Sequence, residues 1–389
     1  MIGQILSIFP HLLFINFVWM SGIYLHIPFC KQKCSYCDFH FSTSFGKYRN
    51  RMIEVLCKEI TDRISSLHEP IQTIYFGGGT PSLLTAEELD ALFSTLRHRA
   101  DLSQVREVTL EANPDDIHDA ALETWKKAGV TRLSIGLQSF KSSDLEWMNR
   151  AHSVKEALQC VPLAQKHGFD NISVDLIYGL PDLTSNEWRD HIANVIAMDV
   201  AHISAYCLTI EEKTLLHQLV EKGKLKPAGD DQQSEQFEIL SKSLVSAGYD
   251  HYEISNFGKP GRHAIHNGNY WKGASYLGIG PSAHSYDGVT RRWNISNNFT
   301  YMKMEGDQWF ESEVLEPKDR WNELLLTGLR TSYGVDQQQL FSIFTPDAAF
   351  SLKVEQFKQN GWMVVKNEHI ILTLEGRLKA DYIASELFR

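Results

Sequence analysis

The sequence predicts an α/β protein, a partial (β/α)6 TIM-type barrel with a smaller C-terminal α+β domain. The main observation is that, between residues 22 and 248, six short runs of β-branched and other apolar residues alternate with segments of helical periodicity. A complete eight-stranded barrel would need more chain than this stretch provides. The 389 residues are also enough for a second domain with its own core.

Local signals place the strands and helices of the barrel. A capping box, in which a Ser or Thr and a Glu three residues later satisfy each other's backbone N–H groups, predicts helix starts at Thr85, Ser153 and Thr184. Pro162 falls inside the second of these helices and should kink it. The six expected strands are 23–27, 73–76, 105–110, 132–137, 172–177 and 202–208.

The remaining chain divides into two parts. Residues 249–316 are rich in Gly, Asn and aromatic residues, and we expect a loop-heavy connector between the core barrel (20–248) and the C-terminal domain (317–389). Helical patterns, then a hairpin with its turn at Asn367-Glu368 and a terminal helix, predict a winged-helix-like domain. Its nine Lys and Arg match nine Asp and Glu, so we expect it to dock partners and not to bind DNA.

Residues 1–19 contain no charged residue. A secretory signal would begin with positive charge, and Pro10, His11 and Asn16 interrupt an apolar stretch that would otherwise suit a membrane span. We therefore expect translation to start at Met20 and residues 1–19 to be a dispensable extension. A membrane anchor is the alternative, and we expect membrane contact to be at most peripheral.

Charge and cysteine usage narrow the class of protein. Asp and Glu exceed Lys and Arg by 48 to 38, a net charge of -10, which argues against binding nucleic acid or an anionic membrane. Six cysteines are too few for a disulfide scaffold. Three of them lie within eight residues, which indicates a metal site in a reducing compartment. We expect the protein in the cytoplasm.

Polar residues follow the expected strands closely. Glu111 and Gln138 come directly after the third and fourth strands, and Asp175 lies inside the fifth. In barrels and open α/β sheets the carboxyl ends of the strands meet at the ligand site. The pattern therefore predicts a ligand site at this end of the barrel.

The three clustered cysteines, Cys30, Cys34 and Cys37, have spacings that can surround one soft metal centre. Zinc is one candidate, with His40 or His26 as a fourth ligand. The other is a [4Fe–4S] cluster with one iron left open. Zinc motifs usually come as two knuckles, and no second CxxC occurs in this chain. The spacing therefore favours the iron–sulfur cluster.

Several motifs together resemble the radical S-adenosylmethionine (SAM) superfamily. Within it, the chain is similar to the group that contains oxygen-independent coproporphyrinogen III oxidase and the heme chaperones, from about residue 22 to the C-terminus. The resemblance implies a barrel of the radical SAM kind. It is carried by the x3/x2 cysteine spacing, by Tyr24-x-His26-x-Pro28-Phe29-Cys30 and by Gly77-Gly78-Gly79-Thr80-Pro81.

The resemblance also implies roles for individual residues. The three cysteines would hold the cluster, and the amino and carboxylate groups of SAM would bind its fourth iron. Tyr24 and Tyr36 would line the adjacent pocket. The other expected contacts to SAM are Gly78, Gly79, Thr80, Glu111, Gln138, Arg150 and Asp175.

Two features separate the subgroups. The oxidase has a fourth cysteine where this chain has Phe39, so we expect no coproporphyrinogen oxidase activity. His266-Asn267-Gly268-Asn269-Tyr270-Trp271 matches the HNxxYW signature of the heme chaperones, and His266 would be an axial ligand to heme iron. A loop histidine beside a tight turn is the alternative.

The resemblance thus implies a heme chaperone that carries a cluster and SAM and delivers heme to acceptors such as respiratory enzymes. The electron donor is not named by the sequence. Oxygen-independent coproporphyrinogen III oxidase, a radical SAM decarboxylase of heme biosynthesis, is the alternative function.

Overall fold

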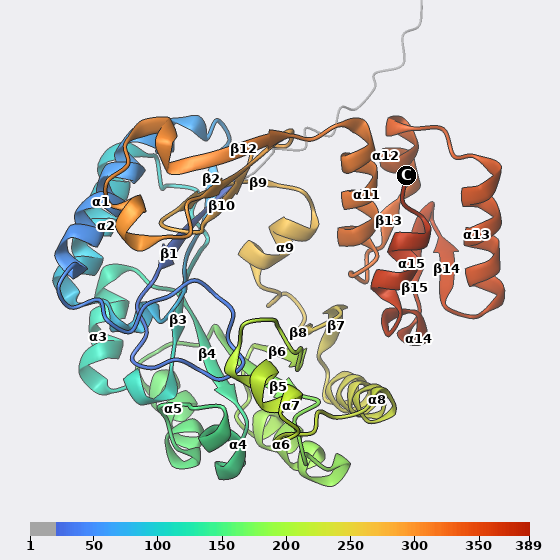
Figure 1. The fold of residues 1–389 in the computed structure, drawn as a ribbon, viewed down its shortest axis with the longest axis horizontal. Coiled ribbons are helices and arrows are strands. Elements are labelled where there is room, and N and C mark those ends of the chain that lie inside the picture. Colours follow the sequence, from blue (N-terminus) through green and yellow to red (C-terminus); the bar gives the residue numbers. More distant parts are fainter. Residues whose placement is uncertain (1–20) are drawn as a thin grey trace, which may run out of the picture.

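A computed structural model describes residues 21–389. It shows a strongly curved sheet with helices on its outer side and a separate C-terminal unit beside it (Figure 1). The predictions about residues 1–19 and a start at Met20 lie outside the described residues.

Six parallel strands form the centre of the sheet and lie next to one another in chain order. All six sequence-predicted strands are confirmed, with bounds that differ by a few residues at most. They are β1 (Ser21–Ile27), β2 (Ile71–Gly78), β3 (Glu107–Ala112), β4 (Arg132–Gln138), β5 (Ile172–Tyr178) and β6 (His202–Cys207).

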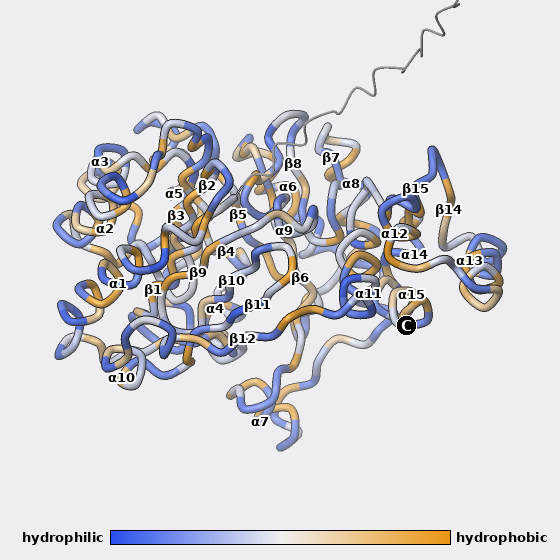
Figure 2. The backbone as a smooth tube through the Cα atoms, turned by 90° about the horizontal axis from the view of Figure 1, so that it is seen from above, coloured by the Kyte–Doolittle hydropathy of each residue, from blue (hydrophilic) through white to orange (hydrophobic). Residues whose placement is uncertain are grey.

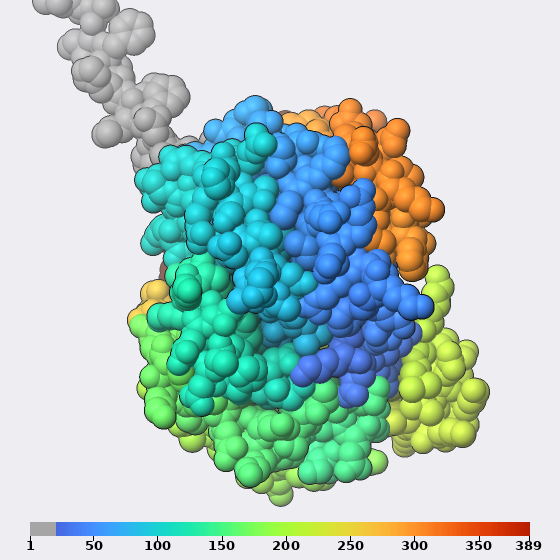
Figure 3. Space-filling model, turned by 90° about the vertical axis from the view of Figure 1, so that its left-hand side faces the viewer, coloured from blue at the N-terminus to red at the C-terminus, as the bar shows by residue number. Residues whose placement is uncertain are grey.

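Helices connect these strands and cover the outer face of the sheet (Figure 1). In the space-filling view of that side, the blue to green segments of the barrel make up most of the surface (Figure 3). The predicted capping boxes at Thr85, Ser153 and Thr184 are present, and Pro162 lies inside a helix that continues past it. The helices are α1 (Arg49–Arg63), α2 (Ala86–Arg99), α3 (Asp119–Ala128), α4 (Ser142–Trp147), α5 (Val154–Lys166), α6 (Ser185–Ala197), α7 (Leu215–Glu221) and α8 (Asp230–Ser246), with single 3-10 turns at Ile64–Ser66, Pro81–Leu83 and Pro114–Asp116.

The strands alternate between two faces, as extended backbone requires. In β4, Leu133, Ile135 and Leu137 are fully buried, whereas Ser134, Gly136 and Gln138 between them line a cavity inside the barrel. The apolar side chains therefore face the outer helices and form the main core, and the strands appear largely apolar in Figure 2. The interior of the barrel is polar, unlike that of a typical closed barrel, which is packed with branched apolar side chains.

Residues 249–316 contain more regular structure than the sequence predicts, because they extend the sheet at both ends. β8 pairs with β6, and β9 pairs with β1 in parallel before three antiparallel strands complete that edge. The added elements are β7 (Asp250–Glu253), β8 (Asn256–Gly258), α9 (Ile265–Trp271), β9 (Ser275–Ile279), β10 (His284–Tyr286), β11 (Thr290–Asn294), α10 (Asn298–Tyr301), a 3-10 turn (Gly306–Trp309) and β12 (Phe310–Val314).

α9 lies where the chain crosses from one end of the open sheet, at β8, to the other, at β9. In Figure 1 it is seen between the barrel and the C-terminal unit. His266 of this helix lies against Gly22 and Thr73, near the amino ends of β1 and β2. α9 therefore sits at the opposite end of the barrel strands from the cysteine loop.

The C-terminal unit has its own core around Trp321 and a three-stranded sheet in the order β13-β15-β14. The predicted helices and hairpin are confirmed, including the turn at Asn367 and Glu368, both of which have positive φ. Its elements are α11 (Pro317–Gly328), β13 (Val335–Asp336), α12 (Gln337–Ile343), α13 (Ala348–Gln359), β14 (Met363–Lys366), β15 (His369–Leu372), α14 (Leu374–Arg377) and α15 (Ala380–Glu386). Within residues 21–389, none of the helices has the length and apolar character that crossing a bilayer requires.

Candidate functional site

A cavity of about 650 Å³ opens at the carboxyl ends of the barrel strands. Its walls come from the loops that follow these strands, as the sequence predicts for a ligand site. The cavity brings together every predicted cluster and SAM residue except Tyr24. Those residues are Cys30, Cys34, Tyr36, Cys37, Gly78, Gly79, Thr80, Glu111, Gln138, Arg150 and Asp175.

The three cysteines lie on the loop after β1, and all are free thiols. Backbone bonds fix this loop: the Cys30 N–H donates to Ser42 O over 3.1 Å, and the Ser42 N–H donates to Pro28 O over 2.9 Å. Burial raises the pKa of Cys30 to about 12 and that of Cys37 to about 11. These thiols therefore stay protonated at neutral pH until a positively charged metal centre favours the thiolates.

The two histidines that could complete a zinc site are engaged elsewhere. His26 Nε2 is 2.7 Å from His40 O, and its Nδ1 is 3.2 Å from the Tyr24 hydroxyl. His40 Nε2 is 2.7 Å from Asn298 Oδ1. Among residues 21–389, no three His, Cys, Asp or Glu side chains are gathered as ligands of a single ion. Three soft thiol ligands facing one cavity fit a [4Fe–4S] cluster in which three irons each take one thiolate and the fourth is left open.

The Arg150 guanidinium contacts three separate segments that line the cavity. Its Nη2 donates to Asn113 Oδ1 over 2.7 Å and to Gly136 O over 2.9 Å, and its Nη1 lies 3.5 Å from Cys34 Sγ. Its Nε is buried and has no hydrogen-bond partner among the described residues. The guanidinium thus places fixed positive charge beside the cysteine loop, where it stabilises a thiolate or a carboxylate.

Two buried carboxyl groups face the cavity from the interior of the barrel. Glu111 accepts hydrogen bonds from the Tyr75 hydroxyl (2.8 Å) and the Gly78 N–H (3.1 Å). Burial, together with the charge of Asp175, raises the pKa of Glu111 to about 7, and burial raises the pKa of Asp175 to about 6. Near neutral pH these groups can accept hydrogen bonds from hydroxyl groups or balance a cationic ligand.

Gly78 and Gly79 have a packing role in addition to the contact with SAM that the sequence analysis expects of them. The N–H of Gly79 donates to Ile27 O over 2.9 Å, and a Cβ on Gly79 would lie 2.6 Å from Phe29 O. Gly78 has φ +107° and packs against the His26 ring. These glycines therefore allow β2 to approach the start of the cysteine loop closely.

Arg330 and Asp381 of the C-terminal unit also line the cavity, and sequence reasoning missed both. Arg330 bonds Asp381 Oδ1 over 3.1 Å and Glu253 Oε1 over 3.3 Å, and its guanidinium lies over the Trp271 ring of α9. The C-terminal unit thus forms part of the wall. No local signal marks these residues, because they come from segments far from the barrel motifs.

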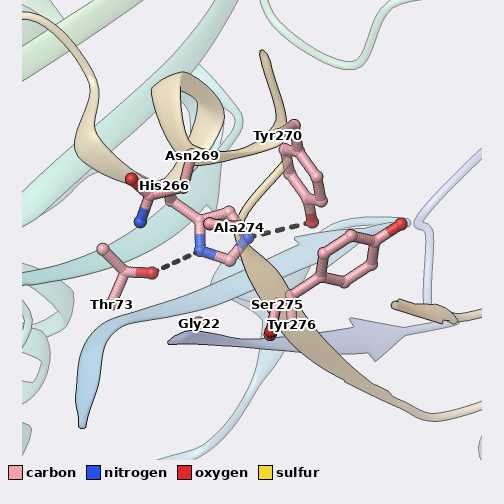
Figure 4. Close-up of a pocket in the computed structure, with 8 residues that line it drawn as sticks. All are labelled: Gly22, Thr73, His266, Asn269, Tyr270, Ala274, Ser275 and Tyr276. Atoms are coloured by element: carbon pink, nitrogen blue, oxygen red, sulfur yellow. Dashed lines mark hydrogen bonds between the residues drawn. The ribbon is translucent and has the colours of Figure 1, made fainter. Parts of the chain in front are cut away.

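His266 does not line this cavity. It is on α9, 3% exposed, and both ring nitrogens are within hydrogen-bond distance of hydroxyl groups (Figure 4). Nδ1 is 2.7 Å from Thr73 Oγ1, and Nε2 is 3.0 Å from the Tyr270 hydroxyl. Burial, and secondarily the charge of Arg132, lowers the pKa of His266 to about 3, so the ring is neutral. Neutral imidazole is the form that binds iron.

Tyr24 also lies outside the cavity lining. Its hydroxyl is bonded to His26, and its ring is stacked 6.5 Å from the His266 ring inside the barrel. The structure therefore places Tyr24 between the cysteine-loop end of β1 and the helix that carries the HNxxYW motif.

Comparison with known proteins shows the family of the chain. Residues 24–195 match the radical SAM superfamily, and residues 315–378 match the HemN C-terminal domain. The chain is 33% identical to heme chaperone HemW of Bacillus subtilis, over 94% of this chain and 98% of that protein. The chain belongs to the HemW family. The radical SAM resemblance is thereby confirmed.

Two further similarities concern the whole chain. A relative from Danio rerio, named radical S-adenosyl methionine domain-containing protein 1, mitochondrial, is 31% identical over 93% of this chain and 86% of its own length. The structure of coproporphyrinogen III oxidase (HemN) from Escherichia coli superposes with a TM-score of 0.81, covering 95% of this chain and 90% of that one at 20% identity. The latter similarity shows a shared fold.

Proposed function

We propose that this protein is a heme chaperone, which binds heme and transfers it to acceptor proteins such as respiratory heme enzymes. The observation that carries the proposal is the likeness, along almost the whole chain, to proteins named heme chaperone HemW. The HNxxYW motif that begins at His266 supports it, because the neutral imidazole of His266 carries nitrogen atoms of the kind that ligate iron. A cytoplasmic location would suit the free cysteines.

We further propose that Cys30, Cys34 and Cys37 hold a [4Fe–4S] cluster and that SAM occupies the adjoining cavity. Such a cluster, when bound and reduced, would supply one-electron reducing chemistry beside SAM. The residues of the chain exclude water and orient the ligand: Arg150 suits a carboxylate, and the carboxylates of Glu111 and Asp175 suit hydroxyl groups and positive charge.

Coproporphyrinogen III oxidase activity is the second candidate, because HemN has the same fold. Phe39 argues against it. This residue occupies the position of the oxidase's fourth cysteine and is 69% exposed at the rim of the cavity, where a phenyl ring cannot supply a thiol.

The test is a titration of the anaerobically reconstituted protein with ferric heme, run beside His266→Ala. We expect saturable one-to-one binding that is lost or spectrally altered in His266→Ala. His263→Ala is the matched control, because His263 is nearby but half-buried and bonded to Asp250 and Tyr333. Equally weak binding by all three proteins would contradict the proposal, and the decarboxylation of coproporphyrinogen would then be assayed.

A further inference from the structure

Arg132 is a buried cation inside the barrel that forms no ion pair within residues 21–389. It is the first residue of β4 and is 1% exposed. Its Nε and Nη1 atoms are buried and have no hydrogen-bond partner among the described residues. Arg63, the other buried arginine of this part of the chain, is ion-paired to Glu59. A buried charge without a direct partner lowers stability, which indicates that the Arg132 cation serves another purpose.

The pairing of the strands places Arg132 next to the two carboxyl groups of the cavity. Arg132 shares the inward face of β4 with Ser134, which lines the cavity. Its partner in register on β3 is Thr109, two residues before Glu111. Ser134, the next inward residue of β4, donates a 3.3 Å hydrogen bond to Asp175. The guanidinium is therefore enclosed in the layer of the barrel that adjoins Glu111 and Asp175.

The other titratable groups around Arg132 leave its charge available to these two carboxyl groups. Glu107, on the same strand as Glu111, is already engaged, because its carboxylate accepts the first two N–H groups of α9 over 3.0 and 2.9 Å. Burial lowers the pKa of the histidines and raises the pKa of the tyrosines that face Arg132 from other elements, so all are neutral between pH 6 and 9. They are Tyr75, His202, Tyr252 and His266.

Glu111 and Asp175 depend on a nearby cation to remain ionised. Burial raises the pKa of Glu111 to about 7 and that of Asp175 to about 6, and the charge of Arg132 acts against this rise in both. Arg150 acts on Asp175 in the same direction, more weakly. Burial also raises the pKa of the remaining tyrosines near the two carboxyl groups, which are therefore neutral: Tyr24, Tyr206 and Tyr270.

We infer that Arg132 is a positioning residue for SAM binding, whose buried guanidinium keeps Glu111 and Asp175 ionised so that both can accept hydrogen bonds from the ligand. The inference rests on the proposed function, in which SAM occupies the cavity. Arg132 is not among the residues that line this cavity, so it acts through the two carboxylates. Neighbouring carboxylates repel each other, and a cation in the adjoining layer offsets that repulsion.

Calorimetric titration of the reconstituted protein with SAM between pH 6 and 9 tests the inference. The affinity of each variant is divided by that of the unmodified protein at the same pH, which removes the titration of SAM itself. Arg132→Met deletes the charge and keeps an unbranched side chain. A nearby opposite charge lowers a carboxyl pKa by about 1–3, and the low end suits a cation without an ion pair. A rise of about 1 in both pKa values cuts the doubly ionised fraction at pH 7 roughly 10-fold. SAM affinity should fall by that factor at pH 7 and recover by pH 9.

Thr109→Val is the matched control, because Thr109 is the register partner of Arg132, is fully buried, and has a hydroxyl without a partner among the described residues. Its affinity ratio should stay near one at every pH. Arg132→Lys keeps a positive charge and should restore most of the affinity at pH 7. Arg132→Gln should behave as Arg132→Met does, and it takes the place of that variant if Arg132→Met fails to fold.

An affinity ratio for the uncharged variants that is the same at pH 7 and pH 9 would overturn the inference, whether the ratio is near one or uniformly low. An equal loss in Arg132→Lys would also overturn it, because the effect would then follow from the shape of the side chain and not from its charge. Absence of SAM binding by the unmodified protein would contradict the proposed function itself, and the inference with it.

Discussion

Tyr75→Phe should shift the pH dependence of SAM binding. The Tyr75 hydroxyl donates a 2.8 Å hydrogen bond to Glu111, which stabilises the ionised carboxylate and lowers the pKa of Glu111 relative to burial alone. A hydrogen bond to a charged group contributes about 1.5–3 kcal/mol, and one pKa unit corresponds to about 1.4 kcal/mol. Without it, the pKa of Glu111 should rise from about 7 to roughly 8–9.

The direction and size of the change in SAM affinity follow from the fraction of Glu111 that is ionised. If SAM binds the carboxylate form, the affinity of the unmodified protein rises with pH as Glu111 ionises, and about half of the protein is competent at pH 7. In Tyr75→Phe only about one tenth to one hundredth is ionised there, so SAM affinity at pH 7 should fall by roughly 5–50-fold and largely recover by pH 9.

Calorimetric titration of the reconstituted protein with SAM between pH 6 and 9 measures this shift. Tyr24→Phe is the matched control, because Tyr24 lies beside Tyr75 but its hydroxyl bonds His26 and not Glu111. Parallel pH profiles for the unmodified protein and Tyr75→Phe would refute the reasoning, as would a loss of affinity at pH 7 that persists at pH 9.

Two other predictions concern the domain contact and the cluster. Arg330→Ala should lower the free energy of unfolding by about 1–3 kcal/mol, because the buried Glu253 carboxylate loses its ion pair. Urea denaturation measures this, and a midpoint equal to that of the unmodified protein would contradict it. Cys30→Ser should abolish the brown colour and most of the iron and sulfide of the reconstituted protein, whereas Cys57→Ser, on α1, should keep them. Full iron in Cys30→Ser would contradict the ligand assignment.

The barrel strands could be predicted because their signals are local. Each is a run of apolar residues, and the capping boxes at Thr85, Ser153 and Thr184 mark where the following helices begin. The meeting of the cysteine loop with the polar residues at the strand ends was also predictable. Parallel strands bring their carboxyl ends together whatever lies between them in the sequence.

The environment of His266 could not be predicted, because long-range contacts create it. Asn267-Gly268 resembles a turn, yet the segment forms a helix whose first N–H groups are satisfied by Glu107, 158 and 159 residues earlier in the chain. β7 to β12 were missed because they are short and become strands only by pairing with β6, β1 or each other. The contribution of Arg330 to the cavity likewise depends on how the C-terminal unit docks.

The two candidate sites lie at opposite ends of one barrel, and tyrosine side chains occupy the space between them. The Tyr75 ring is 5.0 Å from the His266 ring, and its hydroxyl is bonded to Glu111 at the other site. The same side chain thus packs against a ring of one site and donates a hydrogen bond to a carboxylate of the other, so a substitution at Tyr75 alters the surroundings of both sites at once.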